Sequence, residues 1–101
     1  MKFFEYIRQR RELLGLTQKD IAEALSVDVP MYSRYERGLR PLKEAHIPIL
    51  ASMLNMDYEC VRKLWVADKV LSVVNKEKNA TDILYIVADR LTENNEPKYE
   101  S

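Results

Sequence analysis

Several residue types are scarce in this sequence of 101 residues, and each scarcity excludes a class of protein. Cys60 is the single cysteine, so an intramolecular disulfide is impossible. No secretory hydrophobic segment opens the chain, and no apolar run is long enough to span a membrane, so we expect a cytoplasmic protein. Only two glycines and four prolines accompany 47% hydrophobic and 32% charged residues, which favours an all-α fold.

Residues that carry out catalysis or bind metals are equally scarce. His46 is the only histidine, and neither it nor Cys60 has a recognisable orienting partner in the sequence. There is no glycine-rich phosphate loop and no cluster of residues with metal-ligand spacing. The sequence therefore predicts a protein that is not an enzyme and that needs no cofactor or metal.

The balance of charge is neutral overall but uneven along the chain. Sixteen basic residues match sixteen acidic ones. Residues 1–43 hold nine Lys or Arg against six Asp or Glu, an excess of three positive charges, and the remainder is acidic by the same amount. A local basic excess of this kind is the electrostatic signature of a nucleic-acid-binding segment.

Two short helices separated by a tight break, the second and third of the chain, are predicted within residues 11–40. Gly15 can end a first helix that begins near Lys2, and Thr17 with Asp20 forms a capping box that opens a second. After Ser26, Asp28 is a good N-cap, and a proline suits the first turn that follows it. The third helix therefore covers residues 29–37.

The third helix has two different faces. On a period of 3.6 residues, Tyr32 and Tyr35 lie on one side. The opposite side is small, polar and cationic, which a DNA major groove can accept. It consists of Val29, Pro30, Ser33, Arg34 and Arg37.

These features together resemble the phage repressor and Cro-like helix-turn-helix regulators, the XRE family. The likeness covers about residues 4–56 and is carried by Gly15-Leu16-Thr17-Gln18, Ile21-Ala22, Leu25 and the run 33–38. It implies a repressor-like bundle of four to five helices, followed here by a C-terminal extension of two helices. It also implies a transcriptional regulator that binds double-stranded DNA.

The resemblance implies a role for particular positions. Val29, Pro30, Ser33 and Arg34 match base-facing positions, and Arg34 has a guanidinium that fits the acceptors of guanine. Val29 and Pro30 depart from the commoner pattern, because neither side chain can form a hydrogen bond. Arg11 and Glu36 match a structural ion pair. The residues expected at DNA phosphates are Gln18, Lys19, Arg10, Arg37, Arg40, Lys43 and Tyr32, the last with its ring inward and its hydroxyl at the phosphate edge.

The rest of the chain is predicted to be helical. Ile47, Leu50, Ala51 and Leu54 recur at helical spacing in a fourth helix, and Asp57 can cap the next one. We expect a DNA-binding domain at 1–56, an extension at 57–92 and a flexible tail at 93–101. The extension is apolar on nearly every side and must be covered. Its expected dimer-interface residues are Leu64, Trp65, Val70, Leu71, Val74, Ile83, Ile86 and Val87.

Two kinds of function are compatible with this pattern. The first is a homodimeric repressor that binds a palindromic operator through helix 29–37. The second is an interaction module, such as an antitoxin or adaptor, whose C-terminal helices bind another protein. These helices can alternatively pack on their own N-terminal domain. We expect no small-molecule effector. Residues 28–38 and 64–70 also resemble small bacterial regulators associated with DNA methyltransferases.

Overall fold

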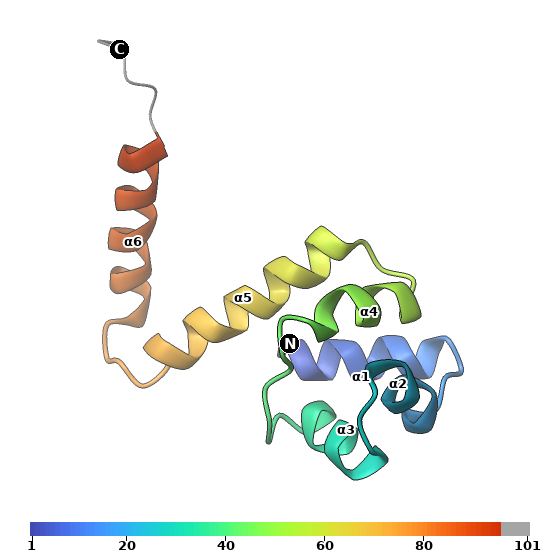
Figure 1. The fold of residues 1–101 in the computed structure, drawn as a ribbon. Helices are drawn as coiled ribbons and strands as arrows, with labels where there is room; N and C mark the ends of the chain where they lie inside the picture. The colour runs from blue at the N-terminus through green and yellow to red at the C-terminus, as the bar shows by residue number, and fades with distance from the viewer. Residues whose placement is uncertain (96–101) are drawn as a thin grey trace. The chain divides into compact units, whose positions relative to one another are not determined.

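The computed structural model describes residues 1–95, with side chains to residue 93, and these residues form helices and no strand (Figure 1). The expected all-α class is confirmed. Of the flexible tail expected at 93–101, residues 93–95 belong to the last helix, and residues 96–101 lie outside the described part. The six helices are α1 (Phe3–Leu13), α2 (Gln18–Leu25), α3 (Val29–Glu36), α4 (His46–Met53), α5 (Tyr58–Val74) and α6 (Ala80–Asn95).

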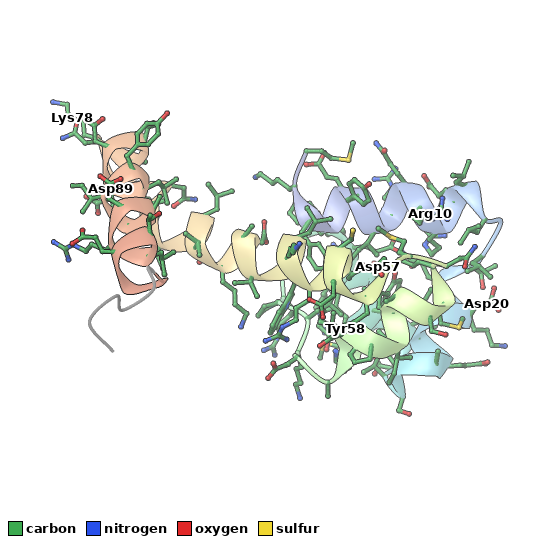
Figure 2. The ribbon with its side chains drawn as sticks, turned by 90° about the horizontal axis from the view of Figure 1, so that it is seen from above. Arg10, Asp20, Asp57, Tyr58, Lys78 and Asp89 are labelled. Carbon is green, nitrogen blue, oxygen red and sulfur yellow. The ribbon has the colours of Figure 1, made fainter. Side chains whose placement is uncertain are left out.

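The helix boundaries follow from local capping. Thr17 Oγ1 accepts from the Asp20 amide at 3.1 Å while the Asp20 carboxylate accepts from the Thr17 amide at 2.8 Å, which completes the predicted capping box of α2. Asp28 caps α3 by accepting from the Met31 amide at 2.8 Å. Asp57, labelled in Figure 2, accepts from an amide in the first turn of α5. Each of these three helices therefore begins where its capping residue predicts.

The first compact unit extends further than the predicted domain. It comprises Met1–Asp68, and a second unit begins at Lys69, whereas the sequence placed the boundary after residue 56. The reason is the burial of Val61 and Trp65, which join the core of the first unit. The first part of α5 is thus a structural element of the DNA-binding domain.

The first unit packs its helices around one apolar core. Within it α2 packs against both α3 and α4, and α1 packs against α3 (Figure 1). Every helix from α1 to α5 contributes to this core, so the two motif helices rest on a common support. The buried residues are Phe3, Ile7, Ile21, Ala22, Leu25, Tyr32, Tyr35, Leu42, Ile47, Leu50, Ala51, Leu54, Val61 and Trp65.

The second unit exposes much of its apolar surface. Val74 is buried in the chain itself, but Val70, Leu71, Ile86 and Val87 are all exposed. Within residues 1–95 no helix is both long and apolar enough to cross a membrane.

Candidate nucleic-acid interface

The two motif helices are joined by a turn that positions α3 against α2. Ser26 ends α2 in the left-handed conformation with φ of 59°, and the Val27 amide donates to the Ala22 carbonyl at 3.0 Å. This arrangement satisfies carbonyls that would otherwise remain unpaired at the end of α2. Sequence reasoning placed a break here but missed the conformation of Ser26, because serine has no strong preference for it.

The outer face of α3 carries the side chains expected to meet DNA bases. Val29, Pro30 and Arg34 are exposed and Ser33 is partly exposed, while Tyr32 and Tyr35 on the other side are buried. The Arg34 side chain forms no hydrogen bond or ion pair with the other described residues. Its guanidinium is therefore available for an external acceptor.

Arg11 and Glu36 form the ion pair that the resemblance implied. Arg11 Nε and Nη2 donate to the two Glu36 oxygens at 2.6 and 3.0 Å, and the Glu36 side chain is only 2% exposed. Arg11 Nη1 also donates to the Leu16 carbonyl at 2.8 Å. Burial raises the pKa of Glu36, but its hydrogen bonds, first of all from Arg11, outweigh burial and lower the pKa below its ordinary value. The pair fastens α1 to the end of α3.

Gln18 is a third member of this buried group. Its Nε2 donates to Glu36 Oε1 at 3.1 Å. A carboxamide nitrogen carries two hydrogens, so one donor remains when the first is used on Glu36. The hydrogen bond to the buried Glu36 therefore orients the Gln18 side chain at the start of α2, the position where the resemblance predicts a phosphate contact.

Tyr32, one of the residues expected at phosphates, is placed differently from the prediction. Tyr32 has no exposed surface, and its hydroxyl is buried beside Glu36 without a hydrogen-bond partner of standard geometry in the described structure. The hydroxyl therefore cannot lie at the phosphate edge. Packing against Arg11 and Glu36 draws the whole side chain inward, and burial is the main cause of its raised pKa.

Arg10, also expected at a DNA phosphate, forms hydrogen bonds within its own domain. On α1, where Figure 2 labels it, its Nε donates to the Leu54 carbonyl at 2.9 Å and its Nη2 donates to the Asn55 carbonyl at 3.2 Å. These carbonyls end α4, so the guanidinium caps that helix. Arg10 therefore has a structural role that was not predicted from the sequence, while its contact with a DNA phosphate stays a prediction.

The segment 37–45 between α3 and α4 presents further cations. Arg37, Arg40 and Lys43 are exposed, as is Lys19 on α2, whereas Leu42 is buried in the core. These four cations are candidates for the DNA backbone. The Leu42 carbonyl accepts from Trp65 Nε1 at 3.0 Å.

The sequence predicted Trp65 as a dimer-interface residue, and this prediction is wrong. Trp65 is only 7% exposed and belongs to the core of its own domain. Val74, the other misassigned position, is also buried within the chain. Helical periodicity indicated that these side chains are buried, but it did not indicate whether the same chain or a second copy buries them. The other expected interface residues remain partly exposed: Leu64, Val70, Leu71, Ile83, Ile86 and Val87.

The family model described as Helix-turn-helix matches residues 7–59, more than half of the chain. No curated protein and no solved structure matches the chain significantly. The matched segment contains all of α2, α3 and α4. The chain belongs to the helix-turn-helix family of Cro/repressor-like, XRE-type DNA-binding transcription regulators.

Proposed function

We propose that the protein is a dimeric repressor that places α3 in the major groove of each half of a palindromic operator. The proposal rests on the outer face of α3, where the Arg34 side chain follows Ser33 and has no hydrogen-bond or ion-pair partner among the described residues. On its other side, α3 is anchored in the core by the buried Tyr32 and Tyr35. An α-helix fits the major groove, and a guanidinium can bind the O6 and N7 atoms of guanine.

The base-reading surface is small. Arg34 and Ser33 are the polar members, while Val29 and Pro30 can only contact a thymine methyl group or respond to groove shape. Gln18, Lys19, Arg37, Arg40 and Lys43 would set the register on the phosphates without reading sequence. So few specific contacts favour the use of two copies on one operator.

The exposed apolar side chains of α5 and α6 support association with a second copy. Leu64, Val70, Leu71, Ile86 and Val87 are all at least one third exposed in the single chain. Exposed apolar side chains in such number are usual at protein interfaces. The same surface also fits the alternative function, in which a different protein, such as a toxin, is bound.

Selection of bound sequences from a random pool of double-stranded DNA tests the proposal. We expect enrichment of an inverted repeat whose half-sites are about 10 base pairs apart, or a multiple of that, from centre to centre. Arg34→Ala should relax the sequence preference at one base pair per half-site and weaken binding by about 1–3 kcal/mol. Arg8→Ala is the matched control, because it removes the same charge from an exposed position on α1. A folded protein that enriches no sequence would contradict the proposed function.

A further inference from the structure

The segment 37–45 has little regular structure, yet it is held at several points. It follows α3 directly and carries Arg40 and Lys43, both exposed. Between these two cations the Leu42 side chain enters the core. A segment that carries exposed positive charge is therefore anchored from within the protein.

The peptide group between Leu42 and Lys43 is bound on both of its polar sides. Its carbonyl, on Leu42, accepts from Trp65 Nε1 at 3.0 Å, and its amide, on Lys43, donates to His46 Nδ1 at 3.3 Å. Two aromatic rings from different helices thus fix one peptide plane. With the carbonyl and the amide both bound, rotation of this peptide would break two hydrogen bonds at once.

Both rings are themselves held in place. His46 is 9% exposed and its ring centroid lies 5.6 Å from that of Tyr35, a buried residue of α3. Trp65 is buried in the core, and the Arg62 guanidinium lies 5.8 Å from its ring centroid. Arg62 in turn donates to Glu44 at 2.8 Å, a second tie between α5 and this segment. The position of the segment therefore depends on α3, α4 and α5 together.

We propose that Trp65 and His46 are positioning residues for DNA binding, which fix the Leu42–Lys43 peptide so that Arg40 and Lys43 meet the DNA backbone without further ordering. This inference rests on the proposed function. Ordering a loose segment at the moment of binding reduces affinity, whereas a segment that is already fixed avoids this loss. Neither ring has to touch DNA for the effect to occur.

The first test compares variants that differ only in the clamp, by which we mean Trp65 and His46 with the peptide that they bind. Trp65→Phe keeps an aromatic ring but removes the N–H donor, and His46→Leu removes the acceptor, while His46→Asn retains an acceptor oxygen. On the DNA sequence enriched by the wild-type protein, we expect Trp65→Phe and His46→Leu to raise Kd about 2- to 10-fold. We expect the slope of log Kd against log salt to become shallower by up to about one for each DNA phosphate that the variant no longer binds. His46→Asn should remain near the wild-type value.

A double-mutant cycle tests whether the clamp acts through the two cations. In a chain that already carries Arg40→Ala and Lys43→Ala, adding Trp65→Phe should change Kd very little, because the side chains that it positions are gone. A full additive effect in that background would overturn the inference. Val61→Ala is the control for stability: Val61 is buried on the same helix, and its truncation should lower the melting temperature without changing Kd in the folded protein.

The remaining outcomes separate the inference from the proposed function. Absence of any DNA binding by the wild-type protein would contradict the proposed function. Wild-type binding that both Trp65→Phe and His46→Leu leave unchanged would contradict only the inference. An equal loss of affinity in Val61→Ala and Trp65→Phe would also overturn it, since both effects would then be general destabilisation. Hydrogen exchange of the Lys43 amide reports the clamp without DNA, and we expect faster exchange in His46→Leu.

Discussion

Gly38 lies against the ring of Phe4, and a Cβ atom at this position would overlap the ring. This close approach brings the end of α3 onto the beginning of α1. Gly38 also has a φ of +72°, a conformation that side chains rarely adopt. Two separate physical reasons therefore require glycine at the point where α3 ends.

Gly15 provides a matched control for a prediction about Gly38. It has the same φ of +72°, but nothing lies within 4 Å of a Cβ added there. We expect Gly15→Ala to cost about 1–2 kcal/mol from backbone strain alone, and Gly38→Ala to cost about 1–3 kcal/mol more from the overlap with Phe4. Denaturant unfolding of both variants measures the difference. Equal losses would mean that the Phe4 ring moves aside freely.

The Arg11–Glu36 pair should make a large contribution when one partner is removed. We expect Glu36→Gln to lower the free energy of unfolding by about 3–5 kcal/mol, because the Arg11 charge would remain largely buried without its partner. The exposed pair of Arg8 and Glu12, with side chains 63% and 53% exposed, is the control. There Glu12→Gln should cost less than about 1 kcal/mol. Similar losses at the two sites would show that burial does not govern these pairs.

The same pair predicts a dependence of stability on acid. Glu36 has a folded-state pKa below its ordinary value of 4.5. Its contribution to stability is therefore complete above pH 4.5 and is lost as the pH falls through the folded-state pKa. Unfolding measured across this range should show a steeper acid loss in the wild-type protein than in Glu36→Gln. Parallel curves would contradict the assignment.

His46 should make the stability of the protein depend on pH in a second, higher range. Burial and then the charge of Lys43 lower its pKa from the ordinary value of 6.5. The unfolded chain therefore binds the proton more readily, so stability should be complete above pH 6.5 and fall as the pH decreases through the folded-state pKa. A proton on Nδ1 would also remove the acceptor for the Lys43 amide. His46→Asn should flatten the stability curve between pH 5 and 7, about the range where histidine titrates, and an unchanged curve would exclude this role.

The sequence predicts local features well because their causes are local. Thr17 and Asp28 cap the helices that follow them, and the bonds involved span only three residues. The alternation of exposed and buried residues on α3 follows from helical period alone. The Arg11–Glu36 ion pair could also be predicted, because the family pattern fixes the positions of both residues.

Features that depend on contacts distant in sequence were not predictable in this way. Helical periodicity predicted that the Tyr32 ring faces inward, but it could not show that the hydroxyl is also buried. Arg10 looked like an exposed cation, because its partners at the end of α4 are more than forty residues away. Trp65 was assigned to a dimer interface, since nothing in the sequence indicates its bond to Leu42. In each case a tertiary partner, absent from the local pattern, decides the role.

We expect α6 to mediate dimerisation through its apolar side. Ile83, Ile86 and Val87 share one side of this helix, and Thr81 lies on the opposite side. We expect the wild-type protein to sediment as a dimer at micromolar concentration and Val87→Glu to shift it towards monomer, because a charge would have to be buried at the interface. Thr81→Glu is the control and should remain dimeric.

The same two variants connect assembly to DNA binding. If two linked copies hold the two half-sites, loss of the dimer should weaken binding to the full operator by about 10²- to 10⁴-fold while leaving binding to a single half-site nearly unchanged. Electrophoretic mobility shifts on both DNAs, with Val87→Glu and Thr81→Glu side by side, measure this ratio. A monomeric wild-type protein on the full operator would exclude dimerisation, and the exposed apolar face of α6 would then have to bind a different protein or its own N-terminal domain.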